Sequence, residues 1–288
     1  MNAHHQSPVL PYAGRSVALL TQHGKERVIA PVLEPALACR VQRVDGYDTD
    51  RLGSFTRDIP RAGSQLDAAR RKARIGMTMA GTPLGLASEG SFGPDPMLGL
   101  IPWNVELLVF LDDEWGIEVV GHAQGRSNHL HHLAADWAAA KVFARQAGFP
   151  DQHLVVRPDG ANEPRHHKGI DTWDALESAF QWAQSQASGG QVFLETDLRA
   201  HANPARMERI RSAAADLVAR MRSCCPSCGS PGFGLVERIA GLPCRDCGAP
   251  TRETRAEVHG CLRCAHRSTR ERTDALTASP ARCDYCNP

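Results

Sequence analysis

Cysteine is distributed unevenly along this chain of 288 residues, because nine of its ten cysteines follow residue 223. Eight of them form four C-x-x-C pairs, which are Cys225/Cys228, Cys244/Cys247, Cys261/Cys264 and Cys283/Cys286. In a reducing compartment such pairs are metal ligands far more often than disulfides, and four thiolates suit tetrahedral zinc. The sequence therefore predicts two structural zinc ions, with disulfides or an iron–sulfur centre as the alternatives.

The spacing of the pairs bears on which cysteines share a metal. The first two pairs read C-x2-C-x15-C-x2-C and the last two read C-x2-C-x18-C-x2-C, both within the range of four-thiolate zinc sites. We expect each ion to bind two consecutive pairs, although an interleaved arrangement stays open. Because the region has little apolar content, metal binding would supply its folding energy. Residues 223–288 are therefore predicted to form a small zinc-ribbon domain.

The charge of this region indicates what it binds. From Cys225 onward it has nine arginines, no lysine and seven acids, and two zinc ions with eight thiolates would bring the total to about −2. A surface for nucleic acid normally carries a clear positive excess, and here only residues 266–273 are locally basic. A structural or protein-docking module is favoured over an RNA-binding one.

A lone carboxylate stands out in the first 222 residues. Glu89 lies among small residues in the stretch P-L-G-L-A-S-E-G-S-F-G-P-D-P, after a predicted strand over residues 84–87. Ligands bind at strand ends in α/β sheets, and small neighbours would let a substrate or metal approach the carboxylate closely. Glu89 is a candidate catalytic residue, and the alternative is an exposed loop acid.

A candidate phosphate site lies earlier in the chain. Residues 17–20 form a short apolar run typical of a buried strand, followed by the polar loop T-Q-H-G-K and then a predicted helix over residues 26–37. A strand, a loop with a hydroxyl and a lysine, and a helix can cradle phosphate. Thr21 and Lys25 are therefore candidate phosphate-binding residues, although the full P-loop motif is missing and an ordinary surface loop stays possible.

The next helix, predicted over residues 64–80, carries two further candidates. Its start bears Asp67, which is a candidate metal ligand but can equally close a capping box with Ser64. Lys72 belongs to a run of four cations in five residues, which is normally a solvated helix face and which would suit a neighbouring phosphate site.

The densest polar block is E-T-D-L-R-A-H-A-N-P-A-R-M, residues 195–207, where Asn203 is a predicted N-cap and Pro204 the first helical residue. Arg199, His201 and Arg206 would then cluster between a strand end and a helix N-terminus, which favours an anionic ligand. An ion-paired corner between strand and helix is the alternative interpretation.

The remaining elements predict an α/β fold, with a mixed sheet and flanking helices, over residues 1–222. Residues 104–120 read as a hairpin whose acidic turn, residues 112–114, we assign to solvent. A helix is predicted from Ser127 to Ala147, with surface histidines at its start. Strands over residues 153–157 and 191–196 enclose a helix over residues 172–187, which predicts a parallel βαβ unit.

Composition excludes some functions. A formal net charge of +1 gives no global attraction to nucleic acid or membrane, and no apolar run approaches the ~18 residues of a membrane span. The N-terminus lacks a charged segment followed by an apolar core, so no signal peptide is expected. The expected location is the cytoplasm, with no membrane partner.

Taken in order, these motifs in residues 15–222 resemble the inosine/xanthosine triphosphate pyrophosphatase-like superfamily. V-A-L-L-T-Q-H-G-K-E resembles its first strand and hydroxyl–lysine loop, G-S-Q-L-D-A-A-R-R-K-A its acid-bearing helix, and L-A-S-E-G-S-F its strand with an essential acid. Asp67 replaces the more usual glutamate, and the cysteine-rich region is foreign to that superfamily. The whole chain more closely resembles a bacterial family that pairs such a domain with a cysteine-rich tail.

The resemblance implies a metal-dependent phosphohydrolase that acts on a non-canonical nucleoside triphosphate or a related phosphorylated metabolite. Glu89 and Asp67 would hold Mg²⁺, Thr21, Lys25 and Lys72 would bind phosphate, and Arg199, His201 and Arg206 would bind the rest of the substrate. A non-catalytic nucleotide-sensing adaptor with a zinc module for protein or RNA is the alternative, and redox chemistry at the C-x-x-C pairs is a third possibility.

Overall fold

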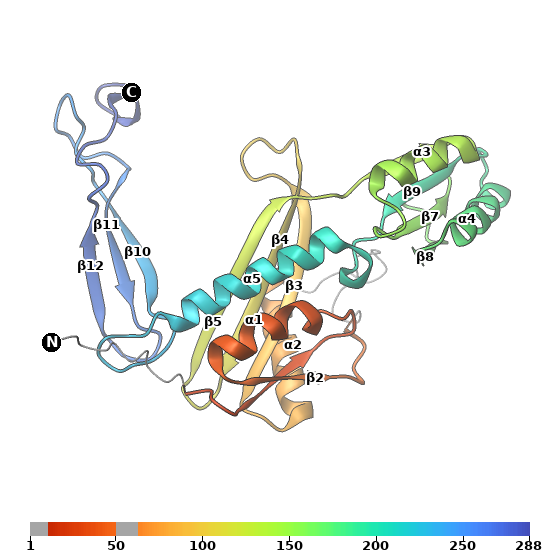
Figure 1. Ribbon diagram of the computed structural model, residues 1–288. Coiled ribbons are helices and arrows are strands. Elements are labelled where there is room, and N and C mark those ends of the chain that lie inside the picture. The colour runs from red at the N-terminus through yellow and green to blue at the C-terminus, as the bar shows by residue number, and fades with distance from the viewer. Residues whose placement is uncertain (1–10, 50–62) are drawn as a thin grey trace.

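The computed structural model describes residues 11–49 and 63–288, and it shows an α/β fold with a mixed sheet, flanking helices and a cysteine-rich extension (Figure 1). Five strands form the central sheet in the order β2-β1-β3-β4-β5. They are β1 (Ser16–Leu20), β2 (Arg40–Val44), β3 (Leu84–Pro94), β4 (Pro102–Asp112) and β5 (Ile117–Arg126). β1 pairs in parallel with β2 and β3, whereas β3, β4 and β5 are antiparallel neighbours. The predicted mixed sheet is confirmed.

Helices cover both faces of this sheet. On one face α1 (Glu26–Leu37) and α5 (Pro204–Arg222) pack over the larger apolar cluster, and on the other α2 (Gln65–Ala80) packs over β1, β3 and β4. Close packing of α5 on β5 depends on Gly121, because a Cβ there would lie 2.5 Å from the Cβ of Leu217. The sheet thus has two different covered faces, and β3 has side chains on both.

A second lobe is inserted between β5 and α5 (Figure 1, green). It contains β6 (His131–Ala134), α3 (Trp137–Ala147), β7 (Leu154–Pro158), β8 (His167–Ile170), α4 (Trp173–Gln186) and β9 (Val192–Thr196). Its sheet has the order β6-β9-β7-β8, and its side chains form an apolar cluster of their own. The short 3-10 helix η2 (Ala200–Ala202) then leads into α5.

Two predictions about this lobe were wrong. β7 and β9 are antiparallel, not parallel, because the chain forms β8 before α4 and so enters that helix travelling in the opposite direction. The helix predicted from residue 127 begins only at Trp137, after the N-cap Asp136, since residues 131–134 instead pair with β9 as a strand. Short polar strands such as β6 and β8 carry little apolar signal of their own.

The acidic hairpin turn was also partly misassigned to solvent. Asp112 is buried, accepting a hydrogen bond from the Tyr12 hydroxyl and two from the backbone N–H groups of Glu114 and Trp115, whereas Asp113 and Glu114 are exposed. Asp112 therefore shapes the turn.

The cysteine-rich extension contains an antiparallel sheet of β10 (Gly234–Ala240), β11 (Thr254–Gly260) and β12 (Arg267–Glu271), followed by η3 (Pro280–Arg282). This sheet stands apart from the central one, at the left of Figure 1. The boundary at residue 223 stays a prediction, and α5 ends one residue before it.

Candidate functional site

The eight paired cysteines gather into two groups that can each hold a zinc ion. Within each group the four sulfur atoms lie within 4.8 Å of one another. The Sγ atoms of Cys225 and Cys264 are 3.8 Å apart, and those of Cys247 and Cys283 are 3.6 Å apart. Four sulfurs at about 2.3 Å from a tetrahedral zinc ion would be ~3.8 Å from one another, so both groups have the size of a zinc site.

The pairs are interleaved, and the expectation of consecutive pairing was wrong. One group is Cys225, Cys228, Cys261 and Cys264, and the other is Cys244, Cys247, Cys283 and Cys286. β10 runs between the first and second pairs, and its seven residues at about 3.3 Å each carry the chain ~23 Å away. β11 returns the chain to the first group. The three-stranded sheet therefore separates the two sites.

Backbone N–H groups point at the sulfurs, as metal-binding knuckles require. Cys261 Sγ accepts hydrogen bonds of 3.3 Å from the N–H groups of Arg263 and Cys264. Hydrogen bonds from the N–H groups of Cys247 and Asp246 lower the pKa of Cys244 to about 7. These donors stabilise the thiolate form, which is the form that binds metal.

The two groups differ in their surroundings. The group that includes Cys261, called here the proximal group, contacts the α/β part: the Arg263 guanidinium stacks 4.5 Å from the centre of the Trp115 ring, and Gly232 lies against Val119 and Leu262. In the other, distal group, the residues Cys247 and Cys286 are exposed. The contacts of Arg263 and Gly232 thus tie the proximal group to the hairpin of β4 and β5.

A second candidate site is a buried cationic pocket where β1 ends. It is lined by Leu20, Thr21, Gln22, His23, Lys25, Thr49, Lys72, Ser88, Glu89 and Arg206. The enclosed space is about 20 Å³, which is room for a water-sized group such as one phosphoryl oxygen. The structure thus brings together five of the residues predicted to act on a phosphorylated substrate: Thr21, Lys25, Lys72, Glu89 and Arg206.

Two hydroxyl groups in this pocket lack a hydrogen-bond partner within the described part of the chain. Thr21 Oγ1 and Ser88 Oγ are both buried, and no donor or acceptor among residues 11–49 and 63–288 satisfies them. Thr21 directly follows β1 and continues its register toward Ser88 on β3, which places both side chains on the face that α1 and α5 cover. Buried hydroxyls normally have partners, so both groups are available to bond a ligand or a water molecule.

Lys25 closes the pocket at the start of α1. Its Nζ donates a 3.0 Å hydrogen bond to the carbonyl oxygen of Ser88. The neighbouring strand β1 ends at Leu20, too early for its backbone to pair with this carbonyl. Burial and the neighbouring charges of Arg206 and Lys72 lower the pKa of Lys25 to about 7. An anion beside Nζ would counter all three causes and favour the ammonium form.

Glu89 lies on the opposite face of β3, toward α2, where its carboxylate forms an ion pair with Lys72. Glu89 lies in the middle of the long strand β3 and not at a strand end. The neighbouring strand β1 is shorter and stops beside Glu89, which exposes Glu89 to the pocket. Among the described residues, the pocket and its immediate surroundings hold three basic side chains, Lys25, Lys72 and Arg206, against the two carboxylates Glu89 and Glu106. These groups carry one positive charge in excess when Lys25 is protonated.

Asp67 is elsewhere. Its carboxylate closes the capping box of α2, accepting hydrogen bonds from the Ser64 hydroxyl and backbone N–H, and it forms an ion pair with Arg70 at the surface. At 100° per residue it is ~140° around the helix from Lys72, and it does not line the pocket.

The described residues do not fit the predicted Mg²⁺ site. Apart from the two cysteine groups, they contain no cluster of three or more acids, histidines or cysteines with ligand atoms close together. The pocket supplies one carboxylate, which Lys72 already neutralises. Magnesium binding by Glu89 and Asp67 stays a prediction that these contacts do not favour.

The three residues predicted to bind the rest of the substrate have different roles. Arg206 is buried and pairs with Glu106, with 2.7 Å between Nε and Oε1. Arg199 forms an ion pair with the buried Asp197, which matches the alternative interpretation of an ion-paired corner. His201 is exposed and stacks on His23, with 5.0 Å between ring centres. Partial desolvation of the imidazole by neighbouring groups lowers the pKa of His201, and the charge of Arg199 lowers it further.

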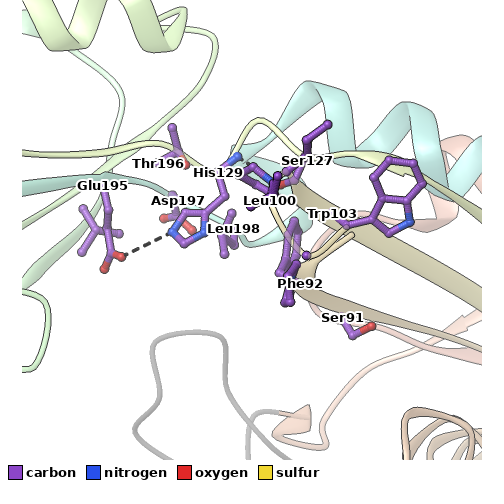
Figure 2. Close-up of a pocket in the computed structure, with 16 residues that line it drawn as sticks. Ser91, Phe92, Leu100, Trp103, Ser127, His129, Glu195, Thr196, Asp197 and Leu198 are labelled. Atoms are coloured by element: carbon purple, nitrogen blue, oxygen red, sulfur yellow. Dashed lines mark hydrogen bonds and ion pairs between the residues drawn. The ribbon is translucent and has the colours of Figure 1, made fainter. Parts of the chain in front are cut away.

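A larger cleft of about 580 Å³ lies between the β3–β4 hairpin and the inserted lobe. Phe92, Leu100 and Trp103 form an apolar wall from the hairpin side, and His129 and Leu198 line the cleft with them (Figure 2). His129 lies 3.9 Å from the carboxylate of Glu195, which the buried Arg157 also contacts. The cleft has the size of a small-molecule site and lies along β3 from the cationic pocket.

Two residues in or beside the cationic pocket, Ser88 and Glu106, were missed from sequence. Ser88 precedes Glu89 and was regarded only as a small neighbour, and Glu106 was assigned to a strand without a role. A signal for Glu106 does exist, because it is the single acid in the otherwise apolar run V-E-L-L-V-F-L and the structure buries it fully. A charged residue inside such a run needs a buried partner, here Arg206.

Comparison with known families finds one matched region that contains both zinc sites and part of the cationic pocket. Residues 72–288 match the model of a domain of unknown function (DUF6671), and because that is about three quarters of the chain, the chain belongs to this family. The matched residues include Lys72, Glu89, Arg206 and all eight paired cysteines. No curated protein matches the chain. Across the described residues, no helix combines the length and apolar character needed to cross a bilayer.

Proposed function

We propose that the α/β part binds the phosphate of a nucleoside triphosphate or a related phosphorylated metabolite in the cationic pocket, and that it hydrolyses this ligand. The observation that carries the proposal is the pair of buried, unpartnered hydroxyls of Thr21 and Ser88 beside the Lys25 ammonium. Hydroxyl donors and an ammonium group suit phosphate oxygens, and the excess of one positive charge favours an anion.

In this proposal the cations stabilise charge on the phosphoryl group while Glu89 orients or deprotonates the attacking water. The water oxygen bonds to phosphorus, and the leaving phosphate takes the bonding electrons. The apolar wall of the cleft would hold the organic part of the ligand, since Ser91 and Phe92 on the cleft side follow Glu89 by two and three residues along β3. At about 3.3 Å per residue this is ~7–10 Å, which a nucleotide spans.

The zinc-ribbon region would dock a partner, and its mixed charge favours protein over RNA. Its exposed distal group is the end free for this purpose. Because thiolates of this kind persist under reducing conditions, the proposal places the protein in the cytoplasm.

The test is phosphate release from a panel of nucleoside triphosphates, canonical and non-canonical, with and without Mg²⁺. Wild-type protein should release phosphate or pyrophosphate from at least one compound. Glu89→Gln should abolish release while the protein still folds, with a lowered melting temperature because Lys72 loses its buried partner. Release by Glu89→Gln at the wild-type rate would remove Glu89 from the chemistry.

A second candidate, a nucleotide-sensing adaptor without turnover, is favoured by one observation. Glu89 is neutralised by Lys72 and Asp67 belongs to the helix cap, so these two carboxylates do not form a pair ready for metal-dependent chemistry. Saturable binding of a nucleotide without any release of phosphate, in the presence of Mg²⁺, would establish the sensor and refute the enzyme.

A further inference from the structure

Arg206 is a fully buried arginine in the first turn of α5. The Asn203 side chain caps the helix by accepting a 2.9 Å hydrogen bond from the Arg206 backbone N–H, which fixes where the side chain starts. Its guanidinium then donates from Nε to Glu106 Oε1 at 2.7 Å and from Nη1 to the carbonyl oxygen of Leu198 at 2.6 Å. The head group is thus held from two directions by different parts of the chain.

The neighbouring strands are built around this ion pair. Gly90 faces it, and a Cβ at that position would lie 2.5 Å from Arg206 Nη2 and even closer to Glu106. Asn104 donates a further hydrogen bond of 3.1 Å to Glu106 Oε1. Desolvating such a pair costs much of what its attraction returns, so stability alone is a poor explanation for it.

The surroundings of Arg206 suggest another role. Its side chain lines the cationic pocket, and its guanidinium carbon lies 5.7 Å from the centre of the Phe92 ring. Phe92 belongs to the hairpin wall of the cleft, and Leu198 belongs to the opposite wall, in the segment that joins the inserted lobe to α5 (Figure 2). One side chain therefore contacts the phosphate pocket and both walls of the cleft.

We propose that Arg206 is a positioning residue that couples occupancy of the cationic pocket to the arrangement of the cleft. This rests on the proposed function in taking phosphate as the ligand of the pocket. An anion beside Lys25 draws the guanidinium toward the pocket, and the bond from Nη1 to Leu198 moves with it. Because coupling is reciprocal, a molecule that holds the cleft walls in their ligand-bound arrangement strengthens phosphate binding in turn.

The experiment is amide hydrogen exchange of the full chain with and without inorganic pyrophosphate as the probe. In wild type, pyrophosphate should change the exchange of amides in residues 198–203 by ~fivefold or more, the lower end of typical coupling between sites. Arg206→Lys keeps the charge but lacks the planar guanidinium whose separate Nε and Nη1 atoms reach Glu106 and Leu198. It should still bind pyrophosphate, more weakly, while the change at residues 198–203 at saturation falls below ~twofold.

Arg211→Lys is the matched control, because Arg211 is on the same helix but pairs with Glu208 at the surface. It should behave as wild type. If Arg206→Lys does not fold, Glu106→Gln serves instead, since it keeps the shape of its side chain and an acceptor for Nε but loosens the hold on the guanidinium. We expect it to reduce the change at residues 198–203 as well.

The outcomes separate this proposal from the previous one. Pyrophosphate that binds wild type without altering residues 198–203 overturns the coupling and leaves the phosphate pocket intact. No pyrophosphate binding at all overturns both. A full-sized change in Arg206→Lys, or in Glu106→Gln where that variant is used, also overturns the coupling, because the bonds named here would then not transmit it.

Discussion

Residue types in the sequence indicated both the zinc sites and the cationic pocket, but the chain brings the side chains of the two sites together in different ways. Each zinc site takes two ligands from each of two tight turns, so half of its geometry is fixed by four consecutive residues. The pocket takes its side chains from the end of β1 and the loop after it, from the segment after β2, and from α2, β3 and α5. Local spacing therefore reveals a zinc ligand, whereas a pocket residue is recognised only once the sheet has placed it.

The largest effect is expected from substitutions that remove one zinc site at a time. Cys225→Ser and Cys283→Ser should each reduce the zinc content from two ions per chain to one, and each removes a share of the ~10–16 kcal/mol that structural zinc typically contributes. Only Cys225→Ser should also destabilise the α/β part, by ~1–2 kcal/mol, because the proximal group packs on Trp115 and Val119.

Elemental analysis and thermal unfolding followed by near-ultraviolet circular dichroism measure these two effects. A wild-type protein with less than one zinc per chain after purification under reducing conditions would contradict the assignment of both sites. Equal destabilisation of the α/β part by the two variants would contradict the difference between proximal and distal groups.

The next effect concerns the pocket. Lys25→Met should weaken binding of pyrophosphate by ~10–100-fold, since a hydrogen bond to a charged group contributes about 1.5–3 kcal/mol. Its melting temperature should not fall, because the wild-type protein bears the cost of burying an ammonium group. Isothermal titration calorimetry gives the affinity, and Lys141→Met, which removes a lysine that lies over Trp137 in the inserted lobe, is the control. Equal affinity of Lys25→Met and wild type would move the anion site elsewhere.

A smaller effect follows from the lowered pKa of Lys25, about 7. Above that pH the side chain loses its charge, so binding of sulfate, whose own charge is constant, should weaken by up to ~tenfold for each further pH unit. Lys25→Arg, which stays protonated, should bind sulfate with little pH dependence between pH 6 and 9. A parallel pH dependence in both proteins would assign it to another group.

The same lowered pKa has the opposite consequence for stability. Between pH 7 and the ordinary lysine pKa of 10.5, the unfolded chain binds more protons at Lys25 than the folded chain does. The destabilising contribution of Lys25 is therefore full below pH 7 and declines as the pH rises. Ligand binding and intrinsic stability should thus respond to pH in opposite directions.

The sequence was sufficient to predict the structural elements that carry a strong local signal. The capping box at Ser64, the N-cap at Asn203 and the apolar run of residues 17–20 were predicted and are present. β6 and β8 were missed because they are four residues long and mostly polar, and missing β8 reversed the inferred direction of β9. One short strand was enough to turn a parallel unit into an antiparallel one.

The candidate site was predictable to a similar extent. Thr21, Lys25 and Glu89 were singled out by loop chemistry and do meet, yet the meeting of Ser88 with Thr21 depends on where β1 stops relative to β3. Zinc ligands were predicted one by one, but their interleaving depends on the length of β10. In both cases the sequence indicated which residues take part, whereas the lengths of the strands determined which residues they meet.

The smallest effect decides the role of Asp67. Asp67→Ala and Ser64→Ala each remove one half of the same capping box, so both should destabilise the protein by ~1 kcal/mol and shift its thermal midpoint by a few degrees. If Asp67 serves only the cap, the two variants should also agree in pyrophosphate affinity and in any Mg²⁺-dependent phosphate release. The carboxylate differs from the Ser64 hydroxyl in being a good Mg²⁺ ligand. Loss of Mg²⁺-dependent release in Asp67→Ala, with release preserved in Ser64→Ala, would therefore show that the side chain leaves the helix cap during turnover and joins Glu89.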